Sequence, residues 1–269
     1  MNARVFQFAA ALILGVCPSI YGATISYQKG ASPSAGYVSD IVSLNQTTPD
    51  TNGVGGGSNF IGHATTGANR AFRSAMGFPL SDIPAGSTIN SVTLTLYGRG
   101  AATAGASSTL YTIELHELTG SFTEAGATWN NRFDAAPAGV GGADVVWATA
   151  GGDFSPTVLS SLTAAPSGVA LNVAYTFSST TDFVAAAQAA LDGTGTLYMV
   201  GLAPLGEVAA NETRFNFGSD DFATLAIRPL LTVDYTPIPE PNSVLILGLG
   251  MAGLASFQRR LRKSVAAGC

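Results

Sequence analysis

An alternating strand pattern constrains the fold of this chain most. Between Ile89 and Tyr97, positions 92, 94 and 96 are apolar, whereas positions 91, 93 and 95 are Ser or Thr. A period of two is typical of a β-strand with one buried and one solvated face. Short strands with connections rich in Gly, Ser and Pro predict an all-β, antiparallel sandwich. The further candidate strands are 24–28, 37–44, 110–116, 169–177, 197–202, 214–217 and 230–235.

One short helix is expected among these strands. Thr180 or Thr181 is a suitable N-cap, and Asp182 places a negative charge in the first turn. Residues 183–191 form the body of the helix, and Gly193 follows its end. We find no internal repeat and no second domain, so residues 24–236 are expected to form a single β-sandwich domain.

The N-terminus has the features of a signal peptide. Arg4 supplies a positive charge, residues 6–16 are apolar, and Gly22 and Ala23 are small residues suited to cleavage. We therefore expect residues 1–23 to be removed on export by the general secretion machinery.

The C-terminus carries three features in a fixed order. Pro239-Glu240-Pro241 is followed by an apolar run at 243–257 and then by a basic stub. Fifteen residues span only about 22 Å as a helix, which is short of the ~30 Å hydrocarbon core. The run is thus a marginal span, and its flanking cations are expected to stay cytoplasmic and fix its orientation. These cations are Arg259, Arg260, Arg262 and Lys263.

This arrangement resembles the C-terminal sorting signal of PEP-CTERM proteins, over residues 237–269. The resemblance implies an exported protein of a Gram-negative bacterium that makes exopolysaccharide. It also implies an exosortase-like membrane protease as a partner, and transient anchoring in the inner membrane through 243–257 before cleavage. The alternative is an ordinary single-span anchor that is never cut.

Cysteine use and charge limit the kinds of site and partner that are expected for residues 24–238, which we call the body. The two cysteines, Cys17 and Cys269, both lie in segments that we expect to be removed. The body therefore lacks a disulfide, a thiol nucleophile and a Cys-based metal site. Residues 24–238 contain seven Lys and Arg against sixteen Asp and Glu. This negative balance argues against nucleic acid and against anionic lipid as partners.

A second resemblance spans most of residues 37–235. The stretches that carry it are 70–73 with Phe78, 81–89, 122–124, 127–130, 215–219 and 228–233. In this order and spacing they are similar to the DNRLRE domain, a jelly-roll module related to carbohydrate-binding modules. The resemblance implies a jelly-roll sandwich. Ser74, Ala75 and Met76 depart from the pattern, because a bulkier apolar run is usual there, and this departure weakens the transfer of a ligand site.

Catalytic motifs are scarce in the sequence. His63 and His116 are the two histidines, and neither belongs to a Ser-His-Asp, His-Glu-x-x-His or phosphate-loop pattern. Glu114, Glu117 and Glu124 are candidates for a glycosidase carboxylate pair. In a regular strand, however, 114 and 116 share one face and 117 points away. We therefore expect solvated carboxylates and a protein that is not an enzyme.

Two kinds of ligand site remain open. Trp129, with Asn130 and Arg132 nearby, could stack on a sugar and bind its hydroxyls, although a tryptophan in the core is the more common case. Carboxylate and amide oxygens in or near loops could hold a structural Ca²⁺, but they show no fixed ligand spacing. These oxygens belong to Asp40, Asp50, Asn52, Asp220 and Asp221.

The sequence therefore favours an exported, non-catalytic protein of the cell surface or extracellular matrix, associated with exopolysaccharide and biofilm. The first alternative is a carbohydrate-binding protein with a defined glycan ligand. The second is a polysaccharide-degrading enzyme. A surface aromatic cluster would favour the binder, and a cleft with paired acids would favour the enzyme.

Overall fold

The computed structural model describes residues 22–53, 55–65, 70–133 and 144–238. Residues 22–237 belong to one compact unit. The signal peptide up to residue 21 and the sorting segment from residue 239 lie outside the described residues. Within the described ranges, no helix is both long and apolar enough to span a membrane.

Antiparallel strands dominate the compact unit. Two α-helices, α1 (Thr181–Asp192) and α2 (Pro204–Glu207), and two 3₁₀ turns, η1 (Pro166–Gly168) and η2 (Leu225–Ile227), interrupt them. The strands are β1 (Ala23–Tyr27), β2 (Asp40–Asn45), β3 (Ser58–His63), β4 (Ala71–Pro79), β5 (Thr88–Tyr97), β6 (Tyr111–Leu118), β7 (Asn131–Phe133), β8 (Val145–Val146), β9 (Phe154–Ala164), β10 (Ala174–Phe177), β11 (Thr196–Leu202), β12 (Phe215–Gly218) and β13 (Leu230–Thr236).

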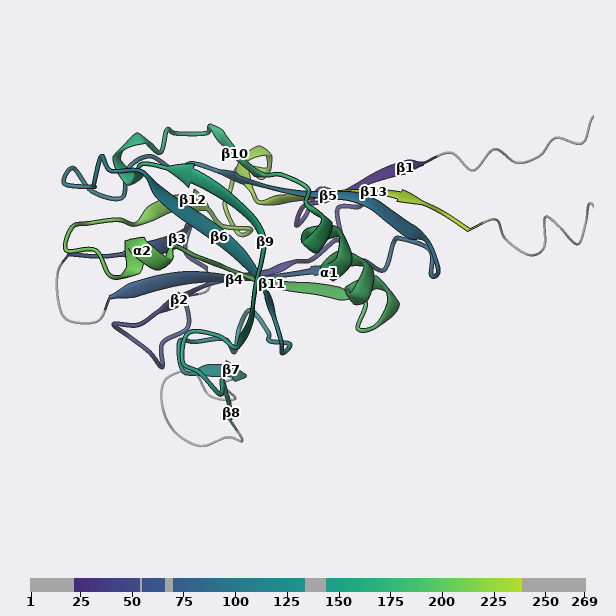
Figure 1. Cartoon of the computed structure of the whole chain (residues 1–269), viewed down its shortest axis with the longest axis horizontal. Helices are drawn as coiled ribbons and strands as arrows, with labels where there is room; N and C mark the ends of the chain where they lie inside the picture. The colour runs from purple at the N-terminus through teal and green to yellow at the C-terminus, as the bar shows by residue number, and fades with distance from the viewer. Residues whose placement is uncertain (1–21, 54, 66–69, 134–143, 239–269) are drawn as a thin grey trace, which may run out of the picture. The chain divides into compact units, whose positions relative to one another are not determined.

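These strands form two main sheets (Figure 1). The first has the order β1-β13-β5-β10, and the second has the order β12-β3-β4-β11-β6-β9, with β2 also paired to β4. Strands β7 and β8 make a separate two-stranded ribbon. Every strand pair within these sheets is antiparallel. The predicted all-β, antiparallel sandwich is confirmed.

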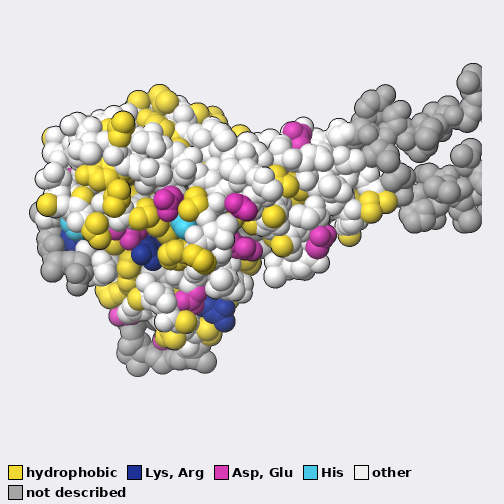
Figure 2. All heavy atoms as spheres, viewed as in Figure 1, with side chains coloured by type: hydrophobic (Ala, Val, Ile, Leu, Met, Phe, Trp, Pro, Cys, Tyr) yellow, Lys and Arg dark blue, Asp and Glu magenta, His cyan; other side chains and the backbone are white. Residues whose placement is uncertain are grey.

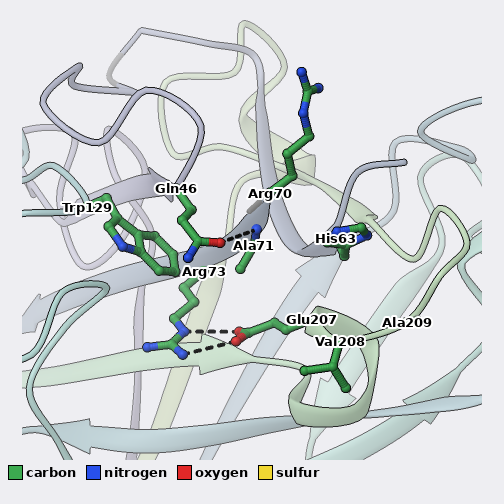
Figure 3. Close-up of a pocket in the computed structure, with 9 residues that line it drawn as sticks. All are labelled: Gln46, His63, Arg70, Ala71, Arg73, Trp129, Glu207, Val208 and Ala209. Carbon is green, nitrogen blue, oxygen red and sulfur yellow. Dashed lines mark hydrogen bonds and ion pairs between the residues drawn. The ribbon is translucent and has the colours of Figure 1, made fainter. Parts of the chain in front are cut away.

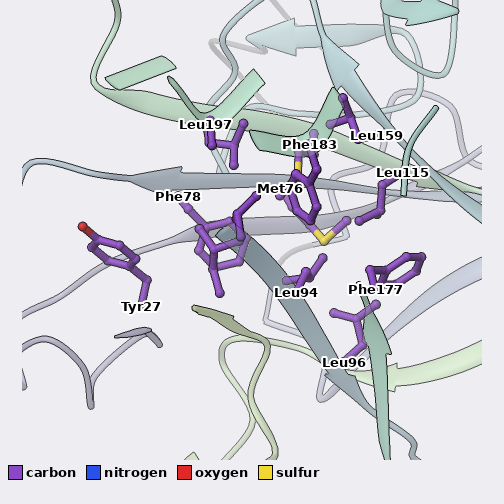
Figure 4. Packing of buried hydrophobic residues seen from close by; sticks show 14 of the residues in the cluster. Tyr27, Met76, Phe78, Leu94, Leu96, Leu115, Leu159, Phe177, Phe183 and Leu197 are labelled. Atoms are coloured by element: carbon purple, nitrogen blue, oxygen red, sulfur yellow. The ribbon is translucent and has the colours of Figure 1, made fainter. Parts of the chain in front are cut away.

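The main core takes side chains from both sheets (Figure 4). Val92, Leu94 and Leu96 of β5 are buried, as their alternation predicts, and the intervening Ser and Thr are partly exposed. From the other sheet, Met76 and Phe78 of β4 belong to the same cluster and are fully buried. The two sheets therefore bury their inner faces against each other, as in other β-sandwiches.

Helix α1 closes one side of this core. It contacts β5 of the first sheet and β9 and β11 of the second, and Phe183 is fully buried. Thr180 is the N-cap, and its Oγ1 accepts a hydrogen bond from the Phe183 N–H at 3.0 Å. Gly193 is the C-cap. The predicted helix and both of its ends are confirmed.

The second sheet is buried on both faces along β2, β4 and β11. A second hydrophobic cluster covers its outer face and includes Ala75, Val200, Phe122, Trp129 and Trp147. A strand that is buried on both faces loses the polar alternation that marks a half-exposed strand. This explains why the run 71–79 reads as apolar without a period of two.

The predicted strand at 169–177 is shorter than expected. The chain first makes η1 and then a turn in which Asn172 has a φ of 60°, and only residues 174–177 form β10. The Tyr175 hydroxyl holds this turn, because it accepts from Ala170 N–H and donates to the Gly168 carbonyl. A side-chain hydrogen bond that closes a turn leaves no signal in hydrophobic periodicity.

Charged side chains are sparse on the surface. On the face drawn in Figure 2, the acidic groups are scattered singly and the basic groups form no continuous patch.

Candidate functional site

A polar pocket with a volume of about 380 Å³ lies on the outer side of the second sheet. We call it the Arg73 pocket (Figure 3). It is lined by side chains from β3, β4 and α2 and from the segments around them. The lining residues are Gln46, His63, Arg70, Ala71, Arg73, Trp129, Glu207, Val208 and Ala209.

Arg73 is the central cation of this pocket. Strand β4 carries it on the same face as Ala71 and Ala75, both of which are in the second hydrophobic cluster. Its Nε and Nη2 each donate to one carboxylate oxygen of Glu207 at 3.0 Å. Its Nη1 donates to the Gly151 carbonyl at 3.2 Å. A bidentate pair of this kind fixes the plane of the guanidinium.

Glu207 is positioned by the short helix α2. The helix begins with Pro204 directly after β11, and the Thr213 hydroxyl donates to the Gly206 carbonyl at 2.7 Å. These contacts bring Glu207 over β4, where its side chain is 11% exposed. Because Arg73 binds both of its oxygens, the carboxylate is held in one orientation.

Gln46 and His63 supply the remaining hydrogen-bonding groups. The Gln46 Oε1 accepts from the Ala71 backbone N–H at 3.0 Å, which turns its amide nitrogen toward Trp129 and Arg73 (Figure 3). His63 lies at the opposite end of the pocket, and its backbone N–H donates to the Thr213 hydroxyl. The pocket thus presents amide, imidazole, guanidinium and carboxylate groups within one hollow.

Trp129 reaches this pocket from the hydrophobic cluster below it. Its side chain is only 6% exposed, and the Arg73 guanidinium lies over its ring at 5.2 Å from the centroid. The guanidinium also lies 5.4 Å from the centre of the Phe154 ring. The ring of Trp129 is therefore used to support Arg73, and it offers no open face on which a sugar could stack.

Asn130 and Arg132 do not line the pocket with Trp129. The Asn130 amide donates to Asp50 at 2.8 Å, and Arg132 packs on Gly120 and over the Phe133 ring. Asn130 and Arg132 thus make contacts away from the Arg73 pocket, and a glycan site formed by Trp129, Asn130 and Arg132 stays a prediction. The second tryptophan of the chain, Trp147, is 4% exposed, and its Nε1 donates to the Thr128 carbonyl.

The three candidate glutamates are also separated. On β6, Glu114 Oε2 lies 3.2 Å from His116 Nε2, in agreement with the expected shared face. Glu117 instead lines a second hollow together with Tyr198. Glu124 belongs to an ionic cluster with Lys29.

Asp40 is the first residue of β2, and the other oxygen groups considered for Ca²⁺ are divided between two places. Asp50 and Asn52 hold the loop near Trp129, where Asn52 donates to the carbonyls of Glu124 and Ala127 at 2.7 Å. Asp220 and Asp221 meet Glu124, and one oxygen from each of these three carboxylates lies within 4.8 Å of the others. The ammonium of Lys29 contacts all three carboxylates. The Lys29 ammonium thus lies beside Asp220 and Asp221, two of the residues that were candidates for Ca²⁺ ligands.

Arg73, Glu207 and Gln46 were not predicted as pocket residues from the sequence. Arg73 carried a usable signal, because a cation inside an apolar strand needs a partner when it is buried. Glu207 and Gln46 carried none, since they reach the pocket only through the pairing of β2, β4 and β11.

A comparison with family models agrees with the reading of the C-terminus. Residues 237–263 match the PEP-CTERM protein-sorting motif. The motif marks an exported protein that is processed at the membrane by an exosortase. Its Pro-Glu-Pro, apolar and basic parts match the features that were singled out in the sequence. No curated protein matches the chain.

Proposed function

We propose that this protein is an exported, non-catalytic component of the cell surface or extracellular matrix of a Gram-negative bacterium. We further propose that its body contacts exopolysaccharide through the Arg73 pocket. The sorting motif supports export and processing. The single observation that carries the contact with a glycan is the lining of the Arg73 pocket.

The chemistry of this lining suits a polyol. Sugar hydroxyls both donate and accept hydrogen bonds, and the pocket offers donors from Gln46 and Arg73 and acceptors from Glu207. The fixed Arg73–Glu207 pair leaves these groups in place before a ligand arrives, which lowers the entropy cost of binding. Recognition would then depend on hydrogen bonds rather than on a stacking platform.

The same lining supports a non-catalytic role. A glycosidase of the common kind needs two carboxyl groups on either side of the scissile bond. Glu207 is the one carboxylate among the described lining residues. A polysaccharide-degrading enzyme therefore remains the less favoured alternative.

Blocking the mouth of the pocket tests this proposal. Val208 lines the pocket and is 80% exposed, so Val208→Arg adds bulk and charge without disturbing the core. Val173 is also exposed and does not line the pocket, which makes Val173→Arg the matched control. The ligand is exopolysaccharide prepared from the producing cells, and the measurement is isothermal titration calorimetry with the processed protein.

We expect the wild type and Val173→Arg to bind with a Kd in the range of about 10 µM to 1 mM. Val208→Arg should weaken this binding by about tenfold or more, which corresponds to ~1.4 kcal/mol. Equal binding by all three proteins would contradict the pocket assignment. Absence of binding by the folded wild type would contradict the contact with exopolysaccharide.

A further inference from the structure

A second constellation of charged groups lies apart from the Arg73 pocket. The Lys29 cluster consists of Lys29 after β1, Glu124 in the loop before β7, and Asp220 and Asp221 after β12. The Lys29 Nζ lies 2.8 Å from Glu124 Oε2, 3.3 Å from Asp220 Oδ2 and 2.8 Å from Asp221 Oδ1. One amine therefore contacts three carboxyl groups that come from distant parts of the chain.

The cluster is largely shielded from water. The side chain of Asp220 is 1% exposed, and those of Glu124 and Lys29 are 12% and 17% exposed. Asp221 is the open member at 34%. Glu124 Oε1 and Asp220 Oδ1 are buried and meet no hydrogen-bond partner among the described residues.

Burial and mutual repulsion keep protons in the cluster. Burial first, and then the charge of Asp220, raises the pKa of Glu124 well above its usual range. Burial likewise raises the pKa of Asp220. Burial lowers the pKa of Lys29, but its hydrogen bonds to Asp221 and Glu124 outweigh this effect and raise it overall. The resting state is thus an ammonium that faces carboxyl groups with a high affinity for a proton.

We propose that Lys29 and Asp220 condense to form an intramolecular amide bond, with Glu124 as the acid that moves the protons. In the first step, a proton passes from the Lys29 ammonium to the Asp220 carboxylate, which leaves a neutral amine and a carboxylic acid. The Nζ lone pair then attacks Cγ of Asp220. One C–O bond breaks as Glu124 protonates the leaving hydroxyl, and Glu124 recovers a proton from the nitrogen. The products are the amide and one water molecule, and no oxidant or activated co-reactant is required.

Geometry favours Asp220 over Asp221 as the acyl partner. The Ser39 hydroxyl donates to Asp220 Oδ2 at 3.1 Å and holds the carboxyl group beside Lys29. Asp221 is partly exposed, and its hydrogen bond to Lys29 lowers its pKa, so it stays an ionised carboxylate that resists attack. Glu124 touches the reacting nitrogen directly. The dry surroundings of Asp220 also limit the access of water that would reverse the reaction.

Such a bond would fasten the segment after β1 to the segment after β12. These two points are far apart in the sequence, and a cross-link that closes a long loop restricts the unfolded chain most in the chain-entropy model. Exported proteins commonly use disulfides for this purpose. Here the two cysteines lie at positions 17 and 269, outside the compact unit, so an amide would supply the covalent link that the body otherwise lacks.

Peptide mapping of the full chain tests the proposal. The protein is purified from its producing cells, denatured, digested and analysed by tandem mass spectrometry. We expect the peptide with Lys29 to be joined to the peptide with Asp220, at a combined mass one water molecule below the sum of the two. Separate, unmodified peptides carrying Lys29 and Asp220 in the wild type would overturn the proposal. A link to Asp221 instead would overturn the assignment of the acyl partner.

Three variants separate chemistry from mere proximity. Lys29→Arg keeps the positive charge and the ion pairs but removes the amine, so we expect no cross-link. Glu124→Gln keeps the size of the side chain but removes the acid, so we expect the cross-link to be lost or strongly slowed. Asp221→Asn should still form the link. Full cross-linking in Glu124→Gln would contradict the role of Glu124 as the acid.

Discussion

At the scale of single residues, Arg73 organises the candidate pocket. Its guanidinium lies over Trp129 and Phe154 and binds both carboxylate oxygens of Glu207. An arginine that is held on all sides in this way presents its remaining donor directions to a ligand with little loss of freedom. The ring of Trp129, which was a candidate for sugar stacking, therefore contributes to the pocket by supporting the guanidinium of Arg73.

The first prediction concerns Trp129. Because its side chain is 6% exposed and packs in the second hydrophobic cluster, Trp129→Ala should lower the free energy of unfolding by about 3–5 kcal/mol. Val146 is 63% exposed, so Val146→Ala serves as the control and should change it by less than about 0.5 kcal/mol. Urea denaturation of the processed protein measures both. A Trp129→Ala variant that retains wild-type stability would show that the ring is not part of the core.

At the scale of elements, α1 is where local sequence signals and the structure agree best. Its start is set by Thr180, whose hydroxyl accepts from Phe183 N–H and donates to the Leu159 carbonyl on β9. The cap therefore fixes both the end of the helix and its position against the second sheet.

Removal of this cap gives the second prediction, which belongs to the scale of elements. Thr180→Ala should lower the free energy of unfolding by about 1–2 kcal/mol, since both hydrogen bonds are lost. Thr180→Ser keeps the hydroxyl and should lose much less. Thermal and urea unfolding of the two variants make the comparison. Equal destabilisation by Ala and Ser would assign the loss to the methyl group and not to the cap.

The strands show where sequence reasoning stops. The half-exposed β5 was predicted from its alternation, whereas β3, β4, β7, β8 and β9 were not predicted as strands. In β9 the burial pattern is irregular, because its pairing with β6 shifts register between Leu115 and His116 and again before Leu118. A bulge of this kind disrupts the period of two on which strand prediction depends. The Arg73 pocket was not predicted for a different reason: it depends on which strands are neighbours in the sheet, and hydrophobic periodicity does not show this.

At the scale of the whole molecule, the first and last strands of the compact unit are partners. Ala23 of β1 lies opposite Tyr235 of β13, and the register continues to Tyr27 opposite Leu231. The start of β1 and the end of β13 therefore lie side by side at the same end of the first sheet. Cleavage after Ala23 would remove a single residue from β1, so the sandwich can remain intact after removal of the signal peptide.

Export followed by processing at the C-terminal motif is the central claim about this protein. Intact-mass analysis of the protein recovered from the surface of its producing cells tests this claim most directly. We expect a mature chain that begins near residue 23 and ends near Pro239 or Glu240, without the apolar run and the basic stub. A mature surface protein that still contains Cys269 would contradict the account.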